Sequence, residues 1–150
     1  MCWNFVRTDR NCEFMKSDQI IPGFGDGGAH GSIIQDAVGA THSLTHWVRD
    51  RSRGERLPIE MIVKKQSADV AELFGLTDRG QLTVGMKADL NCFDLAAMKV
   101  HEPYMMTDTA PGVELERWTQ TVEGYKLTTV AGIPTFRDGQ STGWSTVLND

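Results

Sequence analysis

The stretch Gly23-Phe24-Gly25-Asp26-Gly27-Gly28-Ala29-His30 places one acid among four glycines and ends in a histidine. It overlaps the run Ile20-Ile21-Pro22-Gly23-Phe24, so residues 20–25 read as a short buried strand that opens into a glycine-rich loop. Glycines allow close backbone approach, so a carboxylate at the end of such a strand can point into a pocket. In α/β barrels the carboxyl ends of the strands carry catalytic groups. The alternative is a tight turn in which Asp26 bonds its own backbone, and the local sequence favours neither.

The composition is that of a soluble globular protein. Of the 150 residues, 40% are hydrophobic and 23% are charged, and the formal net charge is -5. An acidic chain of this kind gives no electrostatic case for binding nucleic acid or an anionic membrane. No apolar run approaches the roughly 20 residues that span a bilayer, and the first residues lack the pattern of a signal peptide. Three cysteines without CxxC spacing indicate a reducing compartment, so we expect a cytoplasmic protein. From the charge and the lack of a long apolar run, we expect no nucleic-acid or membrane partner.

Hydrophobic periodicity predicts helices in the first half of the chain. Residues 36–51 carry apolar residues at three- and four-residue spacing, and residues 58–75 read as a helix pair or one kinked helix. Within the second segment, Ser67 resembles an N-cap and Gly75 fits a left-handed stop. Residues 11–19 read as a loop or a short helix.

After Gly80 the pattern changes to strands separated by turns. Cys92 lies in an apolar run and is expected to be a small core residue. The expected elements are strands at 81–84 and 88–94, a long surface loop at 97–112, and a hairpin of strands 126–130 and 135–136.

Four sequence blocks together resemble one known family. They are Gly25–His30, Trp47–Pro58 with Ala71–Leu76, Asp78–Leu90, and Gly124–Gly139. The third block, in which glycines and the pair Ala88-Asp89 recur, is the most specific. With these blocks the chain resembles the amidohydrolase superfamily, and within it the N-acyl-D-amino-acid deacylase (D-aminoacylase) branch.

The resemblance implies that the chain is the C-terminal part of a larger α/β architecture, a (β/α)8 TIM-type barrel with a small β-sandwich domain. Residues 1–19 match poorly, residues 20–77 would supply the last barrel strand and its helices, and residues 78–150 would supply strands of the β-sandwich. The family's His-x-His motif and its later metal-binding residues have no counterpart in this sequence. The apolar faces of strand 20–25 and helix 58–74 then predict association or poor solubility for the chain alone.

The resemblance also implies a reaction, the metal-dependent hydrolysis of the amide C–N bond of an N-acyl amino acid. Zinc polarises the carbonyl and lowers the pKa of a bound water, and the family's last-strand acid carries the proton from water to the leaving amine. That role falls on Asp26, which is also a candidate zinc ligand. His30 is a candidate substrate-binding residue, and the alternative is a loop histidine held by a backbone carbonyl. Two other functions stay open: a catalytically inactive truncated homologue without the metal ligands, and a cyclic-amide hydrolase of the hydantoinase type.

Other histidines and acids are expected to be structural. His42 and His46 have the i, i+4 spacing that can place two imidazoles on one metal. No third ligand is evident, so a helix face with His46 packed near Trp47 is favoured. Asp89 is expected to form structural hydrogen bonds at the entrance of a strand.

Three arginines form a charged run near the end of the first long helix. Their guanidinium groups could bind a substrate carboxylate through two hydrogen bonds. Their place near a helix end favours pairing with surface groups instead. They are Arg49, Arg51 and Arg53.

Overall fold

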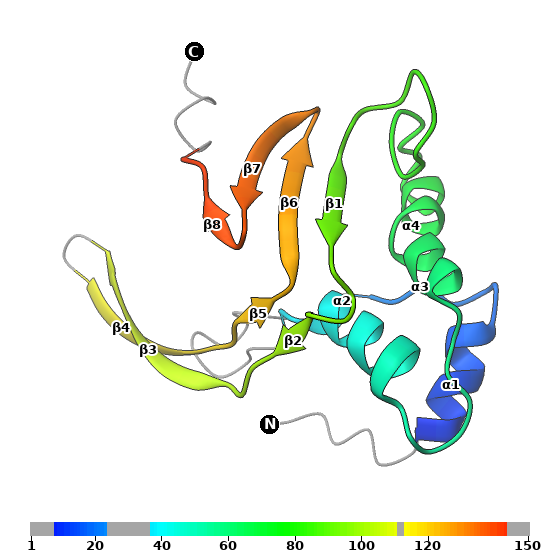
Figure 1. Cartoon of the computed structure of the whole chain (residues 1–150), viewed down its shortest axis with the longest axis horizontal. Helices are drawn as coiled ribbons and strands as arrows, with labels where there is room; N and C mark the ends of the chain where they lie inside the picture. Colours follow the sequence, from blue (N-terminus) through cyan, green and yellow to red (C-terminus); the bar gives the residue numbers. More distant parts are fainter. Residues whose placement is uncertain (1–7, 24–36, 111–112, 144–150) are drawn as a thin grey trace.

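The computed structural model describes residues 8–23, 37–110 and 113–143 (Figure 1). Its helices are α1 (Thr8–Lys16), α2 (Gly39–His42), the π-helix η1 (Ser43–Asp50), α3 (Ile59–Gln66) and α4 (Ala68–Leu73). Its strands are β1 (Leu90–Phe93), β2 (Lys99–Val100), β3 (Tyr104–Ala110), β4 (Val113–Thr119), β5 (Val122–Glu123), β6 (Tyr125–Val130), β7 (Ile133–Arg137) and β8 (Gln140–Ser141). Figure 1 shows the helices gathered on one side of a four-stranded sheet, and a ribbon of β3 and β4 that extends away from both. The described residues form a mixed α/β structure with small antiparallel sheets, and they form no closed barrel.

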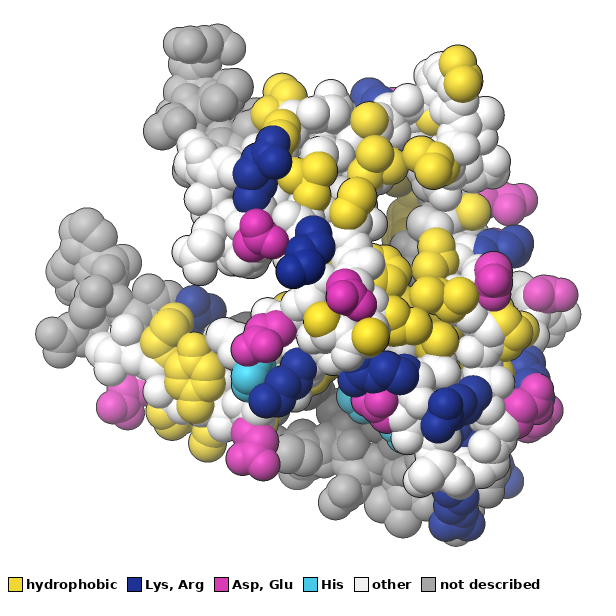
Figure 2. All heavy atoms as spheres, in the orientation of Figure 1, with side chains coloured by type: hydrophobic (Ala, Val, Ile, Leu, Met, Phe, Trp, Pro, Cys, Tyr) yellow, Lys and Arg dark blue, Asp and Glu magenta, His cyan; other side chains and the backbone are white. Residues whose placement is uncertain are grey.

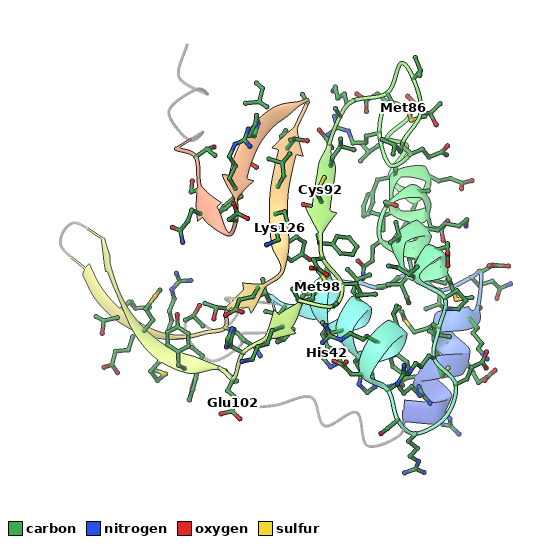
Figure 3. The ribbon with its side chains drawn as sticks, in the orientation of Figure 1. His42, Met86, Cys92, Met98, Glu102 and Lys126 are labelled. Atoms are coloured by element: carbon green, nitrogen blue, oxygen red, sulfur yellow. The ribbon has the colours of Figure 1, made fainter. Side chains whose placement is uncertain are left out.

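The core of the described chain lies where the helices meet the lower end of the sheet. Its buried cluster consists of Cys12, Leu44, Trp47, Leu57, Ile62 and Met98. Met98 is the member that comes from the strand half of the chain, and it lies beside the helices (Figure 3). Each such side chain stabilises the fold by roughly 1.5–3 kcal/mol relative to an exposed position. This cluster therefore fixes the sheet against the helices.

The helix over residues 39–50 changes its winding along its length. The amide of Arg51 donates to the carbonyl of His46 at 2.9 Å, the i→i+5 bond of a π-helix. The hydroxyl of Thr45 donates to the carbonyl of Thr41, one turn earlier in the same helix, at 3.2 Å. The helix predicted over residues 36–51 is confirmed from residue 39 onward.

Residues 59–73 form a pair of helices with a break at Ser67, where φ is -127° and ψ is -78°. Ser67 lies at the predicted N-cap position of α4 but makes no side-chain capping bond, because its hydroxyl donates backwards to the carbonyl of Val63 at 2.6 Å. After α4 the chain turns at Gly75, whose φ of +68° confirms the predicted left-handed stop.

The four-stranded sheet has the antiparallel order β1-β6-β7-β8. Two-residue turns connect its last three strands. The central residues are Ala131 (φ +50°) and Gly132 (+83°) in one turn, and Asp138 (+45°) and Gly139 (+77°) in the other. Positive φ at both positions is typical of type I′ turns, whose twist matches that of the flanking strands. The predicted hairpin of 126–130 and 135–136 is confirmed.

Strands β2 to β5 form a ribbon, which we call the arm. Strands β3 and β4 pair in unbroken register from Tyr104 opposite Thr119 to Ala110 opposite Val113. Closer to the body, the amide of His101 donates to the carbonyl of Thr121 at 3.0 Å and links this ladder to the β2–β5 pair. The surface loop predicted for residues 97–112 is therefore wrong. The polar sequence of this segment arises because both faces of its strands are exposed.

The arm joins the body at Gly124. Its φ is +101°, and a Cβ there would lie 2.6 Å from the Cα of Met98. The carbonyl of Gly124 accepts a hydrogen bond from the amide of Asp94 at 2.9 Å. Only glycine permits this backbone conformation and this approach together.

Three other predictions in the described residues are wrong. Residues 20–23 form no strand, and residues 81–84 lie in a loop. In that loop Leu82 is 88% exposed and Val84 is 103% exposed. Cys92 is exposed on β1 (Figure 3). Each local pattern predicted burial, but the described chain supplies no layer to cover these positions.

Candidate functional site

The predicted site residues lie in the segment 24–36, which is outside the described residues. This applies to Asp26, the predicted proton carrier and zinc ligand, and to His30, the predicted substrate-binding residue. The described chain leads into this segment at Gly23 and leaves it at Ala37. Its contribution to the site is therefore the way in which it holds these two flanks.

The incoming flank is held by a lysine of α3. Lys65 is only 3% exposed, and its ammonium donates to the carbonyl of Ser17 at 2.7 Å and to the carbonyl of Ile20 at 2.8 Å. A buried charge is stable only where hydrogen-bond acceptors replace its water. These two bonds tie the segment before Gly23 to α3.

The outgoing flank is held by the next residue of the same helix. The side-chain amide of Gln66 donates to the carbonyl of Ala40, at the start of the following helix, at 3.1 Å. Adjacent residues of α3, Lys65 and Gln66, thus bind the chain on both sides of the segment 24–36.

The outgoing helix is also fixed to the sheet. The hydroxyls of Thr41 and Tyr125 lie 3.0 Å apart and share a hydrogen bond. The ring of Tyr125 packs edge-on against Phe93, with 6.2 Å between ring centroids. A bond between α2 and β6, supported by ring packing from β1, limits rotation of the helix that follows the loop.

His42 and His46 lie one above the other on this helix. Their ring centroids are 5.2 Å apart and the planes differ by 10°, and Figure 3 shows His42 beside the base of the sheet. Burial, and then the neighbouring His46, lower the pKa of His42 below its ordinary value. Burial, followed by the nearby Arg51, lowers the pKa of His46. His46 also meets Trp47 edge-on at 5.0 Å, so the predicted packing face is confirmed.

Arg49 fixes the loop between β1 and β2. It pairs with Asp50 at 2.6 Å, as a surface arginine does. The same guanidinium also donates to the carbonyls of Leu95 at 2.5 Å and Met98 at 2.7 Å. The prediction of surface pairing is therefore only partly right for Arg49. This residue also joins the helices to the chain that enters the arm.

Arg51 differs further from the prediction. It is 4% exposed, and its guanidinium lies 4.7 Å from the centroid of the Trp47 ring. A cation over an indole face gains about 2 kcal/mol when desolvated. Surface pairing is thus wrong for Arg51, which packs in the interior.

The block that resembles the family most specifically forms an ion network between α4 and β1. Arg79 bonds Asp78 at 3.0 Å and Asp89 at 2.9 Å, and Lys87 pairs with Asp78 at 2.6 Å. Hydrogen bonds from Arg79 and then Lys87 hold the pKa of Asp78 far below its usual range. Asp89 also accepts a bond from the amide of Ala131 at 2.7 Å, which confirms its predicted structural role.

The sequence pattern did not identify the residues that hold the flanks of the segment 24–36, although one of them carried a signal. These residues are Lys65, Gln66 and Thr41. Lys65 follows Ile62 by three residues and so lies on the apolar face of its helix. A lysine within such a face needs a polar partner in the interior. The partners of Gln66 and Thr41 carry no comparable signal, because they are distant in sequence.

The described residues alone do not form a metal centre. They contain no group of three or more His, Cys, Asp or Glu side chains that could hold a metal ion. His42 and His46 are thus a pair without a third ligand among the described residues. No helix in the described ranges is long and apolar enough to cross a membrane.

Comparison with known proteins connects this arrangement to a family. Residues 8–136 match the amidohydrolase family. No curated protein and no solved structure matches the chain. The match includes α1, both flanks of the segment 24–36, the ion network around Asp78 and the arm. Because it covers most of the 150 residues, this chain belongs to the amidohydrolase family.

Proposed function

We propose that this chain forms part of a zinc-dependent hydrolase of N-acyl amino acids, with Asp26 as its proton carrier. Membership of the amidohydrolase family implies hydrolysis of an amide bond, and this family is generally metal-dependent. The D-aminoacylase branch, the substrate class and the role of Asp26 rest on the sequence blocks that resemble that branch.

The observation that carries the proposal is the double attachment of the acid-bearing loop. Lys65 and Gln66 bind the chain at Ile20 and at Ala40, so both ends of the loop are held by one helix. Catalysis requires a carboxylate held within about 0.5 Å of its productive position. The attachment of both flanks of this segment to one helix supports this requirement.

The chemistry assigned to this loop is proton transfer. Zinc, when bound, polarises the amide carbonyl and supplies hydroxide near neutral pH. Asp26 accepts the proton of the attacking water and returns it to the leaving nitrogen. His30, four residues later, contributes to the wall of the substrate pocket. The family's other metal-binding residues have no counterpart in this sequence, so Asp26 would complete a zinc site formed mainly by the rest of the larger architecture.

Metal binding and activity test this function together. The family's His-x-His motif has no counterpart in this sequence, so the chain alone is expected to be inactive. The purified chain is therefore mixed with a polypeptide that carries the upstream barrel segment of an amidohydrolase, the pair is dialysed against zinc, and bound metal and hydrolysis of N-acetyl-D- and N-acetyl-L-amino acids are measured. The proposal expects stoichiometric zinc and hydrolysis for the pair with the wild-type chain. In that pair, Asp26→Asn should lose about 10²–10⁴-fold in rate, the usual contribution of a general base.

Asp138→Asn is the matched control, because Asp138 lies in an exposed turn at positive φ, which asparagine tolerates. It should retain both zinc and activity. A pair with the wild-type chain that binds no zinc and hydrolyses no substrate would support the inactive homologue. Hydrolysis of hydantoins in preference to N-acetyl amino acids would favour the cyclic-amide alternative.

A further inference from the structure

The two strands of the arm differ in the charge that they carry. In a two-stranded ribbon each strand has one edge that its partner does not cover. Strand β4 carries Glu114, Glu116 and Arg117, whereas β3 carries no charge from Tyr104 to Thr107. Natural sheets protect open edges with charged residues, because uncharged edges pair with other strands. Strand β4 has this protection and most of β3 lacks it.

The arm also exposes apolar side chains on both faces. Tyr104 and Leu115 share one face, and Met105 and Trp118 share the other. These four side chains are between 43 and 47% exposed, and Figure 2 shows apolar side chains gathered on the arm. Because an isolated two-stranded ribbon is only marginally stable in water, a further strand would stabilise it.

We propose that β3 of one copy pairs antiparallel with β3 of a second copy, which gives a four-stranded sheet of order β4-β3-β3-β4. A two-fold axis perpendicular to the sheet would relate the two copies, so that each β3 strand pairs with the identical strand of the other copy. Strand β4 cannot pair with itself in this way. Its central registers place Glu116 opposite Glu116, Arg117 opposite Arg117, or Glu114 opposite Glu116, and like charges directly opposite each other are destabilising.

Acidic residues select the register of the β3 pair. An axis at Met105 places Glu102 opposite Asp108, so two acids meet. An axis at Met106 places Asp108 opposite Tyr104, whose hydroxyl can donate a hydrogen bond. An axis at Thr107 places Asp108 opposite Met106, whose side chain cannot donate a hydrogen bond. Glu102 lies at the bend before β3 and points away from the body (Figure 3). The register centred on Met106 is therefore favoured.

The oligomeric state of the full chain tests this interface. By light scattering after size exclusion, the wild type should have twice the mass of one chain. Met106→Lys places two ammonium groups opposite each other, so the dimer should be lost at the concentration where the wild type is dimeric. Leu115→Lys is the matched control, because Leu115 is on the same face of the arm but on β4, and it should remain dimeric. Far-UV circular dichroism establishes that both variants are folded.

Cross-linking tests the register itself. In a background with both Cys2→Ser and Cys92→Ser, which leaves the buried Cys12 as the native thiol, oxidation of Met106→Cys should give a covalent dimer. Opposite residues of paired strands have Cβ atoms about 5 Å apart. Leu115→Cys should cross-link far less. A monomeric wild type, equal effects of the two lysine variants, or equal cross-linking of the two cysteine variants would overturn the proposal.

Discussion

Lys65 acts on a part of the chain far from its own position in sequence. Its ammonium is buried in α3, yet both of its acceptors lie in the segment after α1. The neighbouring Lys64 points outward and pairs with Asp69 on the surface. Two adjacent lysines of one helix therefore have different roles, which a pair of substitutions can separate.

Lys65→Met keeps most of the side-chain volume and removes the charged donor. Hydrogen bonds to charged groups contribute about 1.5–3 kcal/mol, and we expect the free energy of unfolding in urea to fall by about this amount. Lys64→Met should change it by less than about 0.5 kcal/mol, because surface ion pairs contribute little. Equal losses in the two variants would show that the buried bonds do not stabilise the fold.

The histidine pair gives the fold a dependence on pH. Burial lowers the pKa of both His42 and His46 in the folded state, so below their ordinary value of about 6.5 the unfolded chain binds more protons. Stability therefore falls as the pH decreases from about 6.5 towards the lowered folded-state values. Arg51 strengthens this effect at His46, and Asp50 opposes it.

Urea unfolding between pH 7.5 and 5 checks this dependence. The stability of the wild type relative to His42→Gln should decrease over that interval. His101→Gln serves as the control, since His101 pairs with Glu123 on the arm at 2.7 Å. It should leave the contribution of His42 and His46 unchanged. A wild type and a His42→Gln variant with parallel pH profiles would contradict the assignment.

At the scale of elements, the arm is held in place at Gly124. Gly124→Ala would place a methyl group 2.6 Å from the Cα of Met98 at a φ of +101°. Both the strain and the overlap are destabilising, and we expect a loss of at least about 2 kcal/mol in the free energy of unfolding. Gly139→Ala has positive φ but no atom within 4 Å of the added Cβ, so its loss should be only about 1 kcal/mol. Thermal and urea unfolding of the two variants provide the comparison.

Elements with local signals were predictable, and elements that depend on distant contacts were not. The helices around His42 and Ile62 and the hairpin turn at Gly132 follow from spacing and from residue type. The arm was missed because two-sided exposure removes the alternating apolar pattern on which strand prediction depends. The strand expected at 81–84 was predicted from apolar residues that the described chain leaves uncovered.

The same division applies to the candidate site. Asp26 was identified from its glycine-rich surroundings and the resemblance, and its role stays a prediction. Its anchors could not be found in this way. The partners of Lys65 are 45 and 48 residues away in sequence, and hydrogen bonds to backbone carbonyls place no demand on the residue type that provides them.

At the scale of the whole molecule, the described chain exposes many large apolar side chains. Those of the α4 end and the following loop are Leu73, Phe74, Leu76, Leu82 and Val84. Exposed apolar patches mark surfaces that other protein covers, or that aggregate. This agrees with the expectation that the chain forms part of a larger architecture.

Substitution at Leu82, one of the two most exposed of these positions, tests that conclusion. Leu82→Asn should raise solubility and reduce binding of the dye ANS, while the free energy of unfolding changes by less than about 0.5 kcal/mol. Leu57→Asn, at a buried core position, should unfold the chain and increase ANS binding. A loss of stability in Leu82→Asn similar to that of Leu57→Asn would show that Leu82 is already covered in solution.

The attachment of both loop flanks to α3 also has a consequence for how such a protein can change. Since Ile20 and Ala40 are both bound by α3, a displacement of this helix would move both flanks of the segment 24–36 together. Substitutions in α3 at Lys65 and Gln66 are therefore a way to alter the predicted site from outside it, without changing any of its own residues.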